Sequence, residues 1–95
     1  MAQFRVLIQS HTLDDDPWKL QEMFSRRFLV GVENMGGKRF AASFQATSVV
    51  DTVVTLLMKL RDITYLQTCD GDTRYEYSDG CLKKNGEKFA HSFLR

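Results

Sequence analysis

Clustered acidic residues are the first groups in this sequence that could do chemistry. Asp14, Asp15 and Asp16 stand directly before Pro17, and carboxylate oxygens are the ligands that magnesium and calcium prefer. Three adjacent residues of an extended segment do not all point at one ion, whereas a carboxylate beside a proline is typical of the first turn of a helix. The sequence therefore predicts helix capping here rather than a metal site.

A second acidic group, Asp70-Gly71-Asp72, matches the first positions of a calcium-binding loop. The twelfth position of such a loop needs a bidentate acid, and that position falls on Cys81. The glycine expected at the sixth position is missing as well. We expect no calcium site and no other metal site in this chain.

Thiols and imidazoles could supply a nucleophile and its base. The chain has two cysteines, Cys69 and Cys81, and two histidines, His11 and His91. Neither thiol stands in a recognised catalytic motif, and the sequence contains no glycine-rich phosphate loop, nucleophile elbow or His-Glu-x-x-His pair. We expect free structural thiols, no cofactor and no catalytic residue.

Two tyrosines form the more informative pattern. Tyr75 and Tyr77 alternate with Arg74 and Glu76, and the turn before them pairs their strand with the one that contains Leu66, so that the three apolar side chains share one face. Tyrosine offers a large contact area at a low entropic cost, as interface residues do. Two alternatives stay open: an uncovered tyrosine surface for a partner, or tyrosines that line the core.

Basic residues near turns form a second candidate surface. Pairs occur at residues 26–27, 38–39 and 83–84, and the last two pairs lie where long side chains can reach a partner, although solvated loop charges are the default interpretation. The candidate partner-binding residues are therefore Leu66, Tyr75, Tyr77, Lys38, Arg39 and Arg74.

The composition is that of one small folded unit. The 95 residues are 43% hydrophobic and 26% charged, which is outside the range of disordered chains and favours a single domain over residues 1–95. Thirteen basic and twelve acidic residues give a net charge of +1, so the overall charge favours neither nucleic-acid binding nor nucleic-acid mimicry. No apolar stretch reaches the ~18 residues of a membrane span or resembles a signal peptide. We expect a cytoplasmic protein that does not bind a membrane.

The first half of the chain alternates between strand and helix patterns. Residues 4–8 have the two-residue period of a strand with one buried face. A helix is expected to begin at Pro17 and to end near Phe28, with Leu20, Met23 and Phe24 on its apolar side. Residues 28–45 are expected to form a β-hairpin whose turn contains two glycines.

The second half predicts a helix followed by a β-meander. Ser48 and Asp51 form a capping box before an apolar repeat that reaches residue 60, so a second helix is expected although β-branched residues crowd it. Strands are expected at residues 63–69 and 73–77, separated and followed by Asp-Gly and Asn-Gly turns. For residues 89–94, a last strand and a short terminal helix both remain open.

The resulting order, β-α-β-β-α-β followed by further strands, predicts an α+β fold of the ferredoxin-like type with a C-terminal β extension. In that arrangement two helices cover one face of an antiparallel sheet and leave the other face open.

RNA-recognition motifs use the same topology and stack bases on aromatic residues of two central strands. Lys38, Phe40 and Ala41 match the basic, aromatic and small positions of that family's longer motif, and Phe4 stands near its shorter one. An arginine replaces the usual glycine, and Ala42 stands where a stacking aromatic is needed. The sequence therefore resembles the family over only about nine residues.

These observations favour a non-enzymatic protein-binding module, an adaptor or an inhibitor that occludes the surface of a partner. In size and style the chain resembles the small accessory proteins of bacteriophages, including inhibitors of bacterial CRISPR defence complexes, although no motif carries that resemblance. The alternative is a domain that binds single-stranded RNA or DNA through the open sheet face and the basic hairpin. Homodimerisation through an unpaired edge strand also fits the meander.

Overall fold

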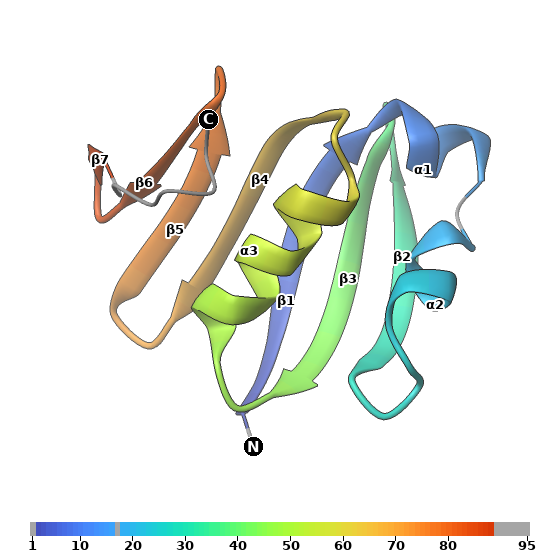
Figure 1. The fold of residues 1–95 in the computed structure, drawn as a ribbon, viewed down its shortest axis with the longest axis horizontal. Helices are drawn as coiled ribbons and strands as arrows, with labels where there is room; N and C mark the ends of the chain where they lie inside the picture. Colours follow the sequence, from blue (N-terminus) through green and yellow to red (C-terminus); the bar gives the residue numbers. More distant parts are fainter. Residues whose placement is uncertain (1, 17, 89–95) are drawn as a thin grey trace.

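One antiparallel sheet extends through the part of the molecule that the computed structural model describes, residues 2–16 and 18–88 (Figure 1). Its seven strands in these residues follow the order β2-β3-β1-β4-β5-β6-β7, and each neighbouring pair is antiparallel. The strands do not close into a barrel, and the helices are few and short. The described residues are therefore a small α+β fold with an open sheet that is larger than the sheet of a ferredoxin-like unit.

The central strand β1 (Ala2–Ser10) confirms the strand expected at residues 4–8. It pairs with β3 (Arg39–Ala46) on one side and with β4 (Ile63–Asp70) on the other. Val6 and Ile8 point into the core, whereas Arg5 and Leu7 point to the opposite face. This alternation gives the central strand one face for folding and another that faces solvent.

The hairpin expected over residues 28–45 is confirmed as β2 (Leu29–Gly36) and β3. Its turn has positive φ at Gly36, Gly37 and Lys38 (82°, 62° and 66°). Glycine adopts this backbone region without a steric penalty, which explains the two glycines before the basic residue.

The second expected helix is confirmed as α3 (Val49–Lys59). Its cap is the predicted one, because the Asp51 backbone N–H donates to Ser48 Oγ at 3.2 Å. Val53, Leu56 and Leu57 of this helix are buried against the sheet, so packing of its apolar face outweighs the weak helix propensity of its β-branched residues.

The single helix expected from Pro17 to near Phe28 is wrong. Two five-residue helices, α1 (His11–Asp15) and α2 (Lys19–Met23), occupy this part of the chain, and Pro17 itself lies outside the described residues. Asp16 accepts the Trp18 N–H at 3.2 Å, but the N-cap of α2 is Trp18, which makes no side-chain capping hydrogen bond, so Asp16 does not cap a helix as expected. Helix α2 ends early because residues 24–28 must reverse direction: the Phe28 carbonyl already accepts from Gln45 of β3, at 2.7 Å.

The α1 helix was not expected from the sequence. It follows β1 directly, and its N-cap, Ser10, is the last residue of that strand. The Ser10 side chain accepts the Leu13 N–H at 3.3 Å. A strand followed at once by a capped turn lets Leu13 and Leu20 reach the core over a short stretch of chain.

The C-terminal meander is confirmed as β5 (Thr73–Ser78), β6 (Cys81–Lys84) and the two-residue β7 (Glu87–Lys88). Its turns contain Gly71, Gly80 and Gly86, all with positive φ. The alternatives for residues 89–94 lie outside the described residues. Strands β2 and β7 are the edges of the described sheet, and pairing of two copies through such an edge stays a prediction.

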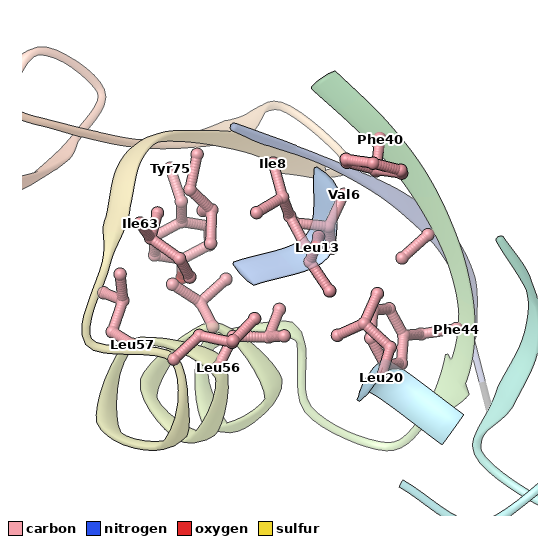
Figure 2. Close-up of a cluster of buried hydrophobic side chains, with 14 of the residues drawn as sticks. Val6, Ile8, Leu13, Leu20, Phe40, Phe44, Leu56, Leu57, Ile63 and Tyr75 are labelled. Carbon is pink, nitrogen blue, oxygen red and sulfur yellow. The ribbon is translucent and has the colours of Figure 1, made fainter. Parts of the chain in front are cut away.

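The core lies between the sheet and the helices, and it contains Tyr75. Figure 2 shows this ring near Ile63 and Ile8, with Leu56 and Leu57 of α3 below. Tyr75 is only 6% exposed. The uncovered tyrosine surface is therefore wrong, and the alternative, that the tyrosines line the core, holds for this residue.

The register explains that correction. Leu66 pairs with Ile8 of β1 and with Tyr77 of β5, so the apolar face of β1 continues through β4 into β5. Leu66 is buried, and Tyr77 packs half-buried against the core. The prediction that Leu66 shares one face with the tyrosines is confirmed, but it is the face that the helices cover.

Candidate functional site

The sheet face without helices is formed by the side chains that alternate with the core residues. On β1 the outward side chains include Arg5, Leu7 and Gln9. The register places Leu7 between Ala41 of β3 and Gln67 of β4. Leu7 is 40% exposed, so the middle of the sheet presents an apolar side chain to solvent.

A hollow of about 530 Å³ lies on this face, and we call it the sheet hollow. Its lining comes from the four neighbouring strands β2, β3, β1 and β4: Leu7, Ile8, Gln9, Met35, Arg39, Tyr65 and Gln67. Met35 is 53% exposed and adds a second apolar side chain. This volume is within the range of sites that bind small ligands or inserted side chains.

Two outward residues of β3 have small side chains, so the helix-free face projects little from this strand beside the hollow. Ala41 and Ser43 follow Arg39 on the outward side of this strand, and Gly31 of β2 lies opposite Ser43. Arg5 of β1 reaches across β3 to Glu33 of β2 and forms an ion pair with an N–O distance of 3.2 Å. Ala41, the residue that pairs in register with Glu33, is buried, and the two charges of the ion pair compensate each other.

The polar side chains of the sheet hollow include two hydrogen-bond donors that no described residue satisfies. The Tyr65 hydroxyl donates to Gln67 Oε1 at 2.7 Å, which leaves the amide nitrogen of Gln67 as a donor. Among the residues that the structure describes, the Arg39 guanidinium has no ion pair and no hydrogen bond. The hollow therefore combines apolar walls with an uncompensated cation.

Asp62 forms a separate polar cluster at the start of β4. Its carboxylate accepts hydrogen bonds from Ser10 Oγ, the Thr12 backbone N–H and Thr12 Oγ1, at 2.8, 2.7 and 2.9 Å. Burial raises the pKa of this carboxyl, but the hydrogen bonds outweigh burial, so the pKa lies below its ordinary value of 3.8. This cluster fixes α1 against the sheet.

The expected partner-binding residues do not form one surface. Arg39 lines the sheet hollow. Lys38 stays at the hairpin turn, where its Nζ lies 3.0 Å from His11 Nδ1. Arg74 is exposed on β5 and pairs in register with Cys69. The expected set is thus divided between the core (Leu66 and Tyr75), the half-buried Tyr77, and separate outward positions.

Sequence reasoning missed the side chains that surround Arg39. Leu7 alternates with Val6 and Ile8 in the sequence, and an apolar residue between Arg5 and Gln9 on the less buried side of this strand was the available indication. Tyr65 and Gln67 could not be placed without the β1–β4 register, because periodicity does not say which face of β4 the helices cover.

The aromatic residues that resembled an RNA-recognition motif point the other way. Phe40 is fully buried on the core side. The Phe4 ring stacks on Phe44 of β3, with a centroid distance of 5.9 Å. Neither ring is available for a nucleic-acid base on the helix-free face, so the resemblance does not extend to the stacking surface of that family.

The remaining chemical groups are dispersed. Cys69 and Cys81 are free thiols, the first of them exposed. Within residues 2–16 and 18–88, no three His, Cys, Asp or Glu side chains are grouped so that they could hold a metal ion. No helix in the described part of the chain has the length and apolar character needed to cross a membrane.

In comparisons with known proteins, no family model matches the chain, and no curated protein or solved structure shows significant similarity to it. The function proposed below therefore rests on the geometry of the chain itself.

Proposed function

We propose that the protein is a non-enzymatic binding module that occludes the surface of a protein partner with its helix-free sheet face. One observation supports this proposal above others: the sheet hollow, whose walls include the exposed side chains of Leu7 and Met35. Apolar anchors surrounded by polar groups are the usual centre of a protein interface.

The types of residue around the hollow support a protein partner over a nucleic acid. Met, Tyr and Arg are enriched in protein interfaces, and Met35, Tyr65 and Arg39 all line the hollow. A single-strand binder needs aromatic rings for successive bases along a basic track. Here the phenylalanines of β1 and β3 face the core, and Arg5 is neutralised by Glu33.

We also propose that β1 to β4 with their helical connections are a ferredoxin-like unit, to which β5 to β7 add an extension. Support comes from the strand order, in which β3 lies between β1 and β2, and β1 lies between β3 and β4. Each helical connection therefore joins two strands that are separated by a third, as in a split β-α-β unit.

A cytoplasmic adaptor or inhibitor, such as a phage accessory protein that blocks a bacterial defence complex, remains the class that we propose. Two free thiols agree with a reducing compartment.

Two matched methionine variants test the proposed surface. Met35→Asp places a charge on the helix-free face, whereas Met58→Asp places the same charge on α3, at nearly the same exposure (53% and 54%). A tagged wild-type protein is used to isolate partners from its host, and the affinity of each variant for the purified partner is then measured. We expect Met35→Asp to weaken binding by roughly 2 kcal/mol or more, about thirtyfold, and Met58→Asp to leave it unchanged.

Other results would contradict the proposal. Equal binding by both variants would place the interface away from the sheet hollow. Micromolar binding to single-stranded RNA that falls steeply with salt would favour the nucleic-acid alternative, because phosphate contacts release counterions.

A further inference from the structure

We infer that the sheet hollow recognises a protein segment in which a carboxylate stands beside an apolar side chain. This inference rests on the proposed function and names the chemistry of the partner.

The positive charge of the hollow has no counter-charge of its own. Arg39 is exposed and makes no ion pair or hydrogen bond within residues 2–16 and 18–88. Glu33, an acidic residue on the neighbouring strand, is held by Arg5 at 3.2 Å. A partner that brings a carboxylate would satisfy the guanidinium through two parallel N–H···O bonds, which gives Arg its preference for carboxylates.

A second donor points to the same ligand. Gln67 lines the hollow, and because its Oε1 accepts from the Tyr65 hydroxyl at 2.7 Å, its NH₂ group is left as a donor. An exposed guanidinium with no counter-charge selects a negatively charged acceptor, and a carboxylate is the acceptor-only side chain of proteins. A basic or purely apolar segment would leave these donors unsatisfied on binding, which is costly.

The register sets the spacing of the side chains that line the hollow. Arg39 and Tyr65 flank Gln9 on opposite sides, so they are separated by two strand spacings, roughly 10 Å. In the adjacent row, Leu7 supplies an apolar wall next to Gln67. A carboxylate that reaches Arg39 therefore places its neighbouring side chain over Leu7 or Met35.

A displayed library of random twelve-residue peptides tests the inference. The library is selected on the wild-type protein after depletion on the Met35→Asp variant, so that retained peptides depend on the sheet hollow. We expect these peptides to share an Asp or Glu next to a large apolar residue.

One selected peptide is then synthesised with its acid and with the corresponding amide, and both forms are titrated by fluorescence anisotropy. On the wild-type protein we expect the amide to bind about tenfold more weakly, as for one lost charge-assisted contact. On Arg39→Ala the two forms should differ less than about twofold, and Arg39→Lys should lie between these limits. Arg74→Ala is the matched control, because it removes an exposed arginine from the same face outside the hollow; it should keep the tenfold preference.

The outcomes separate the two proposals. Retained peptides without acidic residues, or an acid preference that survives Arg39→Ala, would overturn the carboxylate inference while the binding function stands. Failure to retain any peptide that depends on Met35 would overturn the inference and count against the proposed surface as well.

Discussion

Asp62 is expected to contribute more to stability than any exposed acidic residue, because it anchors α1 through three hydrogen bonds. Ser10 Oγ, the Thr12 N–H and Thr12 Oγ1 all donate to its carboxylate, at 2.7 to 2.9 Å. Ser10 also caps α1 by accepting the Leu13 N–H. Removing the carboxylate therefore disturbs both the junction between β1 and α1 and its contact with β4.

The expected loss follows from what each donor can do without Asp62. Ser10 is 1% exposed, so its hydroxyl cannot turn to water, and an unsatisfied buried donor costs about 1–3 kcal/mol. Thr12 is half-buried and regains part of its hydrogen bonding from solvent. We expect Asp62→Ala to lower the free energy of unfolding by about 2–3 kcal/mol, and Asp62→Asn, which keeps one acceptor oxygen, by about 1 kcal/mol.

Urea unfolding followed by circular dichroism measures these losses. Trp18 fluorescence is a poor probe, because this side chain is already 67% exposed in the folded protein. Asp72→Ala is the matched control: Asp72 is exposed in the turn between β4 and β5, and its removal should change stability by less than about 0.5 kcal/mol.

The pH dependence provides an independent check on the same residue. The pKa of Asp62 is lowered in the folded protein, so ionisation of this carboxyl stabilises the folded state relative to the unfolded state. Its contribution is complete above the unfolded pKa, about 4, and is lost as pH falls through the lower folded value. The stability difference between wild type and Asp62→Asn should therefore be about 1 kcal/mol at pH 7 and smaller at pH 2.5. A constant difference across this range would refute the assignment.

Two further substitutions and one thiol measurement test the structure elsewhere. Tyr75→Ala should cost about 3 kcal/mol or unfold the protein in a thermal melt, because the ring is buried in the core; a wild-type melt would contradict the core assignment. Ser48→Ala should lower stability by about 1 kcal/mol through loss of the α3 cap, measured by urea titration. Thiol titration of protein purified without reductant should find both cysteines reduced, and maleimide should label Cys69, which is exposed, before the half-buried Cys81.

Strands and turns were predictable because their determinants are local. The Asp-Gly and Asn-Gly pairs indicated the turns of the meander, where their glycines have positive φ. Ser48 indicated the start of α3. The helical stretch after β1 was not predictable in the same way. Its end depends on the contact between Phe28 and Gln45, which are far apart in the sequence, so tertiary pairing outweighed the local helical spacing of Leu20, Met23 and Phe24.

The candidate site was predictable only in part. The two-residue alternation correctly placed Leu66 on the same face as the tyrosines. A period of two assigns residues to faces, but it does not show which face the helices cover. Arg39 was selected for its place beside the hairpin turn, and it lies in the hollow because it pairs with Gln9 across β1 and β3. The side chains that accompany it come from four strands, which no local pattern brings together.

The division between the two faces of β3 has a consequence for how binding can change independently of folding. Phe40 and Phe44 fill the core, while Arg39, Ala41 and Ser43 alternate with them on the outer side. Because both phenylalanines of β3 point inward, only Ala41 and Ser43 stand beside Arg39 on the outer face, and the hollow does not depend on a gap in the core. If the proposed function holds, substitutions at the exposed residues of the hollow should therefore change binding while the packing against α3 stays intact.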